Sequence, residues 1–344
     1  MLKKIHSSIY SRSGGAELTD AKKQFYRYFE SEFESKYKEE KDEMLSLHKQ
    51  FVKELKVGGI KTIVLLIVLE FIISFTPYPT IPYLIVFLGV PIVVFARIYN
   101  KNAEKIARVK ELKQKMMQEL LNFFIPSIKF DPINAITEEE FKSYNVFTKE
   151  KIDIFTSEDA VIGQMGTLDF RISDVKIEDK IKTQDQSYTE EVFNGLVGEF
   201  NFHKNFDFEM SIVPKEYKSN TIQQYFDTKS MGLTVEEVSI ADFDFEKEFE
   251  IHSSDQVKAR VILTPEFMGK LMKVKEERFN EIAIVLKEGK FIVLINTGKD
   301  YFNIEEEKLF DKERIWEDVT DLVDLIYLIV QLDMNERLRK YKKI

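Results

Sequence analysis

A nearly uncharged apolar stretch constrains this chain more than any other feature. The segment LLIVLEFIISFTPYPTIPYLIVFLGVPIVVF, from Leu65 to Phe95, carries one charge, Glu70, although 32% of all residues are charged. It is the central part of two apolar runs, Val57 to Phe75 and Ile81 to Ala96, joined by a turn with two prolines. A membrane-spanning helix needs about 20 apolar residues, and both runs are somewhat shorter. The pattern predicts an α-helical transmembrane hairpin over residues 57–96.

Two other arrangements of this segment stay open: a hairpin buried in a soluble core, and a re-entrant hairpin whose turn remains inside the bilayer. Glu70 is the polar residue to explain, because a carboxylate at mid-bilayer costs roughly 2.5–3.5 kcal/mol and is a functional-site hypothesis by default. Its position close to the turn favours an interfacial or oligomer-packing role. The alternative is a transport or channel component that uses Glu70.

Basic residues flank the hairpin on both sides, and the turn has none. By the positive-inside rule, this distribution places both termini in the cytoplasm and the turn outside. The sequence therefore predicts a multi-pass protein of the cell (inner) membrane, with the lipid bilayer as one partner. The flanking residues are Lys53, Lys56 and Lys61 before the hairpin, and Arg97, Lys101, Lys105 and Arg108 after it.

The two arms beside the hairpin read as amphipathic helices. In the N-terminal arm, residues 1–56, aromatic residues recur every fourth position from Phe25 to Tyr37. In the second arm, residues 97–125, apolar residues from Ile106 to Phe124 form a similar stripe. Such stripes are the ordinary signal of helix packing. We expect the arms to pair as an antiparallel stalk.

Residues 126–344 change to short alternating runs with interleaved helices, which indicates an α+β domain with a mixed or antiparallel sheet. The runs NEIAIVL and KFIVLINT flank a tight hairpin at Lys287 to Gly289. Thr137 and Glu140 have capping-box spacing. The segment DFDFEKEFE, Asp242 to Glu250, alternates acidic and Phe residues and reads as a strand. The last helix, from about Arg314 to Lys340, is apolar on most sides.

Composition excludes several classes of function. The region after Lys115 has 30 basic and 46 acidic residues, which argues against nucleic-acid binding. Cysteine is absent, so disulfide-linked partners and thiolate metal sites are excluded. The four histidines lack ligand spacing, and no phosphate-binding loop or nucleophile elbow occurs. We therefore predict no catalytic residue, no metal and no cofactor.

Two segments carry a family resemblance. FEKEFEIHSSDQVKARVILTPEFMGKL, Phe245 to Leu271, and VFNGLVGEFNFHKNF, Val192 to Phe206, resemble a bacterial family of domains of unknown function, numbered 3137. The resemblance covers roughly Glu190 to Phe302 and implies a membrane hairpin ahead of the domain, but no activity. Its most specific positions are the family-motif candidates Asp255, Gln256, Arg260, Thr264, Pro265 and Phe267, with Ala259 among them.

Three functions follow as hypotheses. The first is a membrane-tethered interaction or scaffold module that binds a protein partner or its own copies. The second is a hydrolase-like enzyme at the membrane surface, with His252, Asp255 and Arg260 as the residues to suspect. The third is the transport component that uses Glu70. Arg260 is expected to pair with a nearby carboxylate such as Glu248 or Glu250, although its planar fork also suits an anionic ligand.

Overall fold

We analysed a computed structural model of the chain. It describes residues 22–73, 80–125, 127–144, 152–165, 168–182, 187–201, 208–215, 236–277, 279, 281–302 and 311–331. Side chains are not described for 70–73, 80–88, 165, 182, 277, 327–328 and 330–331.

The chain divides into two compact units. We call the described residues up to Met117 the helical unit and those from Gln118 onward the sheet unit. The division falls inside a helix, α6. The four segments predicted from the sequence, with boundaries at 56, 96 and 125, stay a prediction.

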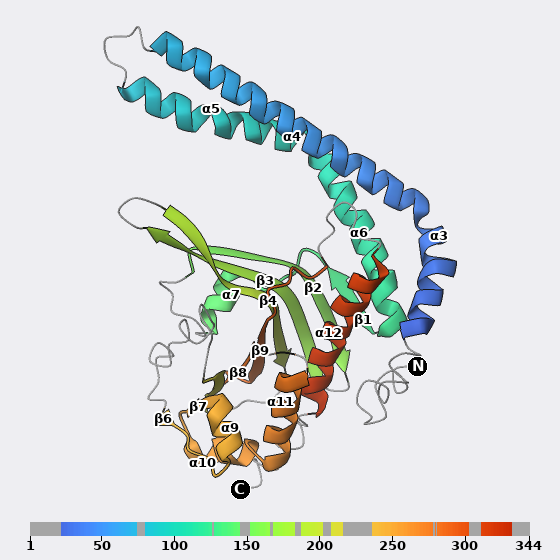
Figure 1. Cartoon of the computed structure of the whole chain (residues 1–344), viewed down its shortest axis with the longest axis vertical. Coiled ribbons are helices and arrows are strands. Elements are labelled where there is room, and N and C mark those ends of the chain that lie inside the picture. Colours follow the sequence, from blue (N-terminus) through green and yellow to red (C-terminus); the bar gives the residue numbers. More distant parts are fainter. Residues whose placement is uncertain are drawn as a thin grey trace. The chain divides into compact units, whose positions relative to one another are not determined.

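The sheet unit is an α+β fold built on one nine-stranded sheet, in the order β1-β2-β3-β4-β9-β8-β5-β7-β6 (Figure 1). Every neighbouring pair is antiparallel, which agrees with the alternating runs of the sequence. The strands are β1 (Ile128–Asp131), β2 (Ile154–Met165), β3 (Leu168–Lys182), β4 (Ser187–Asn201), β5 (Met210–Pro214), β6 (Glu236–Glu237), β7 (Phe249–Ser253), β8 (Glu281–Lys287) and β9 (Lys290–Asn296).

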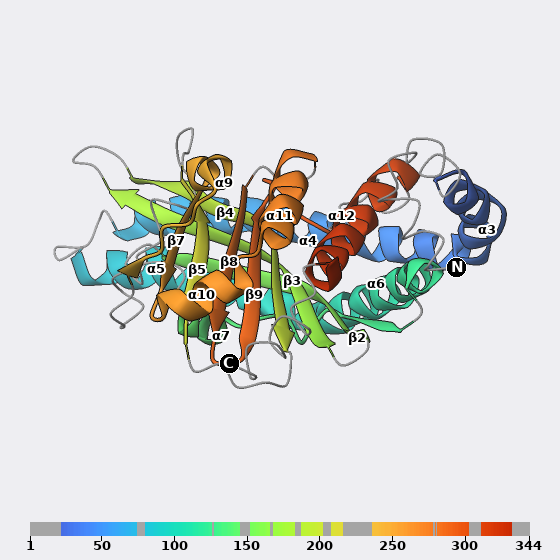
Figure 2. The ribbon, with the colours of Figure 1, turned by 90° about the horizontal axis from the view of Figure 1, so that it is seen from below.

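In the described part of the sheet unit, five helices follow the end of α6. Figure 2 shows α11 and α12 on the same side of it. The last of them, α12, was expected to extend to about Lys340, but the described part ends at Gln331. The helices are α7 (Glu138–Ser143), α9 (Phe243–Glu248), α10 (Gln256–Ile262), α11 (Pro265–Glu277) and α12 (Lys312–Gln331).

Local signals in the sequence account for several of these elements. The β8–β9 hairpin turns at Glu288 and Gly289, whose φ angles of 49° and 78° are those of the turn that matches strand twist. The predicted hairpin is therefore confirmed. Thr137 and Glu140 form the predicted capping box of α7, in which each accepts the other's backbone N–H.

One local prediction is wrong. Residues Phe243–Glu248 form α9 rather than a strand, and only from Phe249 does the chain become extended as β7. The side chain of Asp242 accepts a hydrogen bond from the backbone N–H of Phe245 and so begins the helix. Phe245 and Phe249 stack with their centroids 4.8 Å apart and are both buried. The alternation of Phe and acidic residues thus serves a helix followed by a strand.

The helical unit is formed by α4 (Lys38–Ile73), α5 (Thr80–Lys101) and the larger part of α6 (Ala103–Phe124). Ahead of α4, residues 22–28 are helical, followed by the π-helical segment η1 (Phe29–Phe33) and α3 (Glu34–Lys36). The long N-terminal helix predicted from the sequence is therefore interrupted at Tyr37, where φ is −108° and ψ is 15°.

Ion pairs join α4 to α6 in antiparallel register. As residue numbers rise along α4, the numbers of the partners on α6 and at the end of α5 fall, which is the pairing expected of the two arms. The partners are Glu40 with Lys115 at 2.9 Å, Glu43 with Arg108 at 2.9 Å, and Glu54 with Lys101 at 3.0 Å.

The predicted transmembrane hairpin requires correction. Among the residues that the structure describes, no helix combines the length and the apolar composition needed to cross a bilayer. In α4, the run between Lys61 and Glu70 has only eight residues, and the uncharged part of α5, Ile81 to Ala96, has 16. This finding contradicts the transmembrane hairpin over 57–96 and the multi-pass cell-membrane location with both termini in the cytoplasm.

Candidate functional site: the groove between α4 and α5

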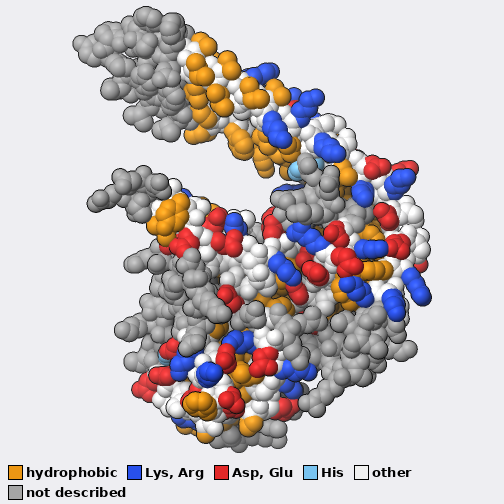
Figure 3. Space-filling view, in the orientation of Figure 1, with side chains coloured by type: hydrophobic (Ala, Val, Ile, Leu, Met, Phe, Trp, Pro, Cys, Tyr) orange, Lys and Arg blue, Asp and Glu red, His pale blue; other side chains and the backbone are white. Residues whose placement is uncertain are grey.

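Exposed apolar side chains concentrate on α4 and α5. Of the fifteen large hydrophobic side chains that are exposed among the described residues, eleven lie on these two helices. In α4, Ile60 and Ile63 are 63% and 60% exposed, and in α5, Ile92 is 67% exposed. Figure 3 shows hydrophobic side chains along this part of the molecule. A contiguous exposed apolar surface marks an interaction site more often than a solvated face.

A groove runs between the two helices, with a volume of about 730 Å³. The helices approach closely at Gly58, where an added Cβ would lie 2.2 Å from Cδ1 of Ile98. Next to Gly58, the Thr62 hydroxyl donates a hydrogen bond to the Gly58 carbonyl at 2.8 Å, so this hydroxyl is paired within its own helix. The lining residues are Gln50, Lys53, Glu54, Val57, Gly58, Lys61, Thr62, Leu65, Val94, Arg97, Ile98 and Lys101.

The groove combines apolar walls with cationic side chains. Its carboxylate, Glu54, accepts hydrogen bonds from Asn102 and Lys101, both at 3.0 Å, and Lys105 lies 3.5 Å away. These contacts, led by the Asn102 hydrogen bond, lower the pKa of Glu54 to about 2. The carboxylate therefore stays ionised and bound to its own partners at neutral pH.

The family-motif candidates occupy local structural positions. The carboxylate of Asp255 accepts the backbone N–H groups of Val257 and Lys258, both at 3.0 Å, and begins α10. Asp255 is thus the N-cap of α10. Thr264 caps α11 by accepting from the Phe267 N–H at 3.2 Å, with Pro265 as its first residue.

Arg260 pairs with no carboxylate among the residues that the structure describes. Its guanidinium donates to the Ser239 carbonyl at 3.1 and 3.2 Å and to the Gln256 side chain at 3.1 Å. The two carboxylates expected to pair with it bond other residues, Glu248 with Lys275 and Glu250 with His252. Gln256 in turn donates to Glu236 at 3.0 Å. These contacts tie α10 to the segment before α9.

The residues of the enzyme hypothesis line neither the α4–α5 groove nor the cleft around Glu281 and Asp321. His252 is 9% exposed, its Nε2 lies 3.1 Å from the Glu250 carboxylate, and its buried Nδ1 has no partner. It stands opposite Ser211 of β5, which is 1% exposed. His252 and Ser211 are therefore both buried where β5 pairs with β7.

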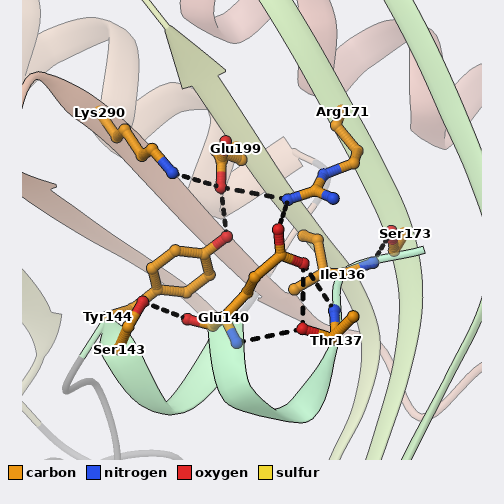
Figure 4. A network of polar contacts seen from close by, with 9 residues as sticks. All are labelled: Ile136, Thr137, Glu140, Ser143, Tyr144, Arg171, Ser173, Glu199 and Lys290. Carbon is orange, nitrogen blue, oxygen red and sulfur yellow. Dashed lines mark hydrogen bonds and ion pairs between the residues drawn. The ribbon is translucent and has the colours of Figure 1, made fainter. Parts of the chain in front are cut away.

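A polar network fastens α7 to the sheet (Figure 4). Tyr144 donates to the carboxylate of Glu199 on β4, and Lys290 of β9 lies 3.2 Å from the same carboxylate. Arg171 of β3 donates to Glu140 at 2.8 Å. Burial and the neighbouring Glu199 raise the pKa of Tyr144. Sequence reasoning found only the capping role of Glu140, because the other members come from separate strands.

The sheet unit has a cleft of its own, which is polar and has a volume of about 450 Å³. Lys299 lies 3.0 Å from the Asp321 carboxylate, which also accepts from the Tyr301 hydroxyl at 2.9 Å. Burial raises the pKa of Glu281. Within the described chain, no group of three or more His, Asp or Glu side chains is arranged to hold a metal ion. The lining residues are Glu191, Val192, Phe193, Phe279, Glu281, Asn296, Thr297, Gly298, Lys299 and Asp321.

Glu70, the residue of the transport hypothesis, lies in α4, and its side chain is outside the described part. The turn residues 76–79 are outside the described part as well, and of Thr80 only the backbone is described.

Fold and site together define a class of protein: an antiparallel α+β domain joined to a helical unit with an exposed apolar groove. Residues 191–334 match the family described as "Protein of unknown function (DUF3137)", so this part of the chain belongs to that family. The family prediction is confirmed, and the match extends past Phe302 through α12. All residues that line the polar cleft lie within the matched segment.

The other comparisons add little. No curated protein matches the chain. Among solved structures, the crystal structure of the mycobacterial trehalose monomycolate transport factor A, TtfA, is similar, with 13% identity and a TM-score of 0.32, over 56% of this chain and 86% of that one.

Proposed function

We propose that this chain is an interaction module that binds a protein partner through the exposed apolar face of α4 and α5. The observation that carries the proposal is the concentration of exposed apolar side chains on these helices, beside a groove of about 730 Å³. Keeping so much apolar surface in water costs roughly 25 cal/mol for each Å², which a partner's apolar side chains recover when they cover it.

The arrangement also suits a recurring mode of recognition. An amphipathic helix binds by laying its apolar side chains in a groove between two helices of its receptor. The α4–α5 groove has apolar walls from Val57, Leu65 and Val94 and a polar rim. Interfaces of this anatomy, with an apolar centre and a polar edge, bind without any catalytic group.

Site-specific photocrosslinking tests the proposal. A photoreactive amino acid replaces Ile63, which is 60% exposed on α4, and in a control it replaces Phe243, which is 81% exposed in the sheet unit. We expect a protein adduct from position 63 and none from position 243, with the crosslinked peptide of the partner identified by mass spectrometry. The proposal fails when position 63 yields no protein adduct, or only lipid adducts.

A pair of substitutions gives the complementary result. Ile63→Asp places a charge on the apolar face and is expected to reduce crosslinking from the neighbouring position 67 to background. Phe243→Asp is the matched control, because it changes an exposed large apolar side chain outside α4 and α5. Equal loss with both variants would contradict a site on α4 and α5.

A further inference from the structure

The groove of the proposed function has an excess of positive charge. Four cationic side chains line it, Lys53, Lys61, Arg97 and Lys101, against one carboxylate, Glu54. Lys101 is already bonded to Glu54 at 3.0 Å. Within the described part of the chain, Lys53, Lys61 and Arg97 form no ion pair. Three cations thus remain available around an apolar groove.

The spacing of these cations follows a helix. Lys53 and Lys61 are eight residues apart on α4, which corresponds to about 12 Å along the helix axis. Two acidic residues separated by seven or eight positions on a partner helix have the same spacing. Arg97 supplies a third positive charge from α5, on the opposite wall. A helix lying lengthwise in the groove would therefore meet a cation at both ends of its buried face and one beside it.

Charge also argues against a dimer in which the α4–α5 faces of two copies of this chain bind each other. An isologous contact would bring Lys53, Lys61 and Arg97 of both copies together, and like charges at an interface cost several kcal/mol. The acidic apolar helix of the chain itself, α12, has its apolar residues buried in the sheet unit, with Leu322 and Ile326 both 0% exposed. It is not available to the groove of another copy while the sheet unit is folded.

We infer that the partner of the α4–α5 groove is an acidic amphipathic helix of another protein, an inference that rests on the proposed function. Its apolar residues lie against Val57, Leu65 and Val94, and its carboxylates pair with the three available cations. A concave groove accepts a projecting helix, whereas a flat lipid surface would contact only its rim. Partly desolvated pairs of this kind contribute specificity and association rate as well as affinity.

Binding of designed peptides to the full-length protein tests this inference. The probes are helical peptides of about 18 residues, about 27 Å long, with one Leu face and a polar face of Glu, of Lys, or of Gln. We expect the Leu/Glu peptide to bind about tenfold tighter than the Leu/Gln peptide, and the Leu/Lys peptide to bind weakest. The preference for Glu should shrink as salt is raised.

Charge reversal supplies the matched comparison. The variant Lys53→Glu/Lys61→Glu/Arg97→Glu should prefer the Leu/Lys peptide. A control triple at exposed positions outside the groove, Lys38→Glu/Lys110→Glu/Lys180→Glu, makes the same change in net charge and should keep the wild-type order. Circular dichroism confirms that both variants are folded. Equal preference in the groove variant and the control would overturn the inference, since net charge alone would then explain binding.

A control with lipid vesicles distinguishes a helical protein partner from a lipid surface. The same proteins are mixed with phosphatidylglycerol vesicles and with phosphatidylcholine vesicles. Binding to phosphatidylglycerol vesicles without preference among the peptides would overturn the inference in favour of a lipid surface. A protein adduct from position 63 together with equal affinity for all three peptides would reject the acidic helix while leaving the proposed function intact.

Discussion

The sheet unit covers its apolar side chains, whereas the helical unit leaves many of its own exposed. In the sheet unit, strand residues such as Val175, Phe193 and Leu294 are 0% exposed and share one core with α7. In the helical unit, the aromatic stripe from Phe25 to Tyr37 is buried, but the face of α4 and α5 beyond it is open. The difference shows that most large exposed apolar side chains of the described residues belong to α4 and α5, the face on which the proposed function rests.

Charge is distributed differently as well. Acidic residues of the sheet unit enter its interior, as Asp174 and Asp318 do, at 5% and 7% exposure. Ion pairs of the helical unit, such as Glu43 with Arg108, stay at its surface. We therefore expect electrostatic substitutions to act strongly in the sheet unit and weakly in the helical unit.

The largest expected effect concerns Asp174. Burial, and then the charge of Asp300, raise its pKa to about 9, against about 3.9 in an unfolded chain. Between these values the folded chain holds a proton that the unfolded chain has lost. Stability that is complete below about pH 4 is therefore lost as pH rises toward 9. The loss amounts to up to about 4 kcal/mol between pH 5 and pH 8.

Asp174→Asn removes this dependence, since the amide oxygen can still accept the Tyr301 N–H, at 2.5 Å in the wild type. Urea unfolding at pH 5 and at pH 8 should show a difference between the two pH values that is smaller in the variant. A variant with the same pH dependence as the wild type would show that Asp174 is ionised in the folded chain.

The second effect tests how closely the central strands pack. An added Cβ at Gly195 of β4 would lie 2.2 Å from the Ile295 carbonyl oxygen of β9, and backbone cannot yield as a side-chain tip does. Gly195→Ala is expected to cost roughly 3 kcal/mol in the free energy of unfolding. Gly269→Ala on α11 is the control, because nothing lies within 4 Å of its added Cβ. Equal stability of the two variants in thermal unfolding would contradict close packing of β4 against β9.

The third effect concerns the network between α7 and the sheet. Arg171→Met keeps an unbranched apolar side chain but leaves Glu140 without its cation, and it is expected to cost about 2 kcal/mol in urea unfolding. Lys180→Met on the same strand is the control, since Lys180 is exposed. A loss with Lys180→Met as large as that with Arg171→Met would show that the network does not stabilise the fold.

The smallest effect belongs to the helical unit. Arg108→Ala removes the contacts to Glu43 at 2.9 Å and to Glu111 at 3.0 Å, all on exposed surface. Because solvent and salt screen such pairs, we expect the Tm to change by less than about 2 °C. Differential scanning calorimetry measures it, and a decrease as large as that of Arg171→Met would remove the contrast between the two units.

Much of the fold follows from local patterns. The alternating runs predicted β8 and β9, Lys287 to Gly289 predicted their turn, and Thr137 with Glu140 marked where a helix begins. These signals are local because a turn or a cap depends on residues two or three positions apart. The segment from Asp242 misled for the same reason: its alternation fitted a strand, but the side chain of Asp242 begins a helix.

The candidate site was less accessible to sequence reasoning. The apolar composition of α4 and α5 is plain in the sequence, but it predicts a transmembrane hairpin, which the described helices do not support. The polar cleft and the Arg171–Glu140 contact could not be predicted from the sequence, because their residues are far apart along the chain. Asp255 and Arg260 were found by resemblance, and their capping and bridging contacts depend on the backbone around them.

By itself, the sequence determined which segments alternate, which are striped, where caps and turns fall, and which family the segment 191–334 belongs to. These are properties of neighbouring residues, so local chemistry is enough to decide them. Only the tertiary structure decided the order of the nine strands, the burial of Asp174 and the opening of a basic groove between α4 and α5. Each depends on residues brought together from distant parts of the chain, where packing rather than local preference sets the outcome.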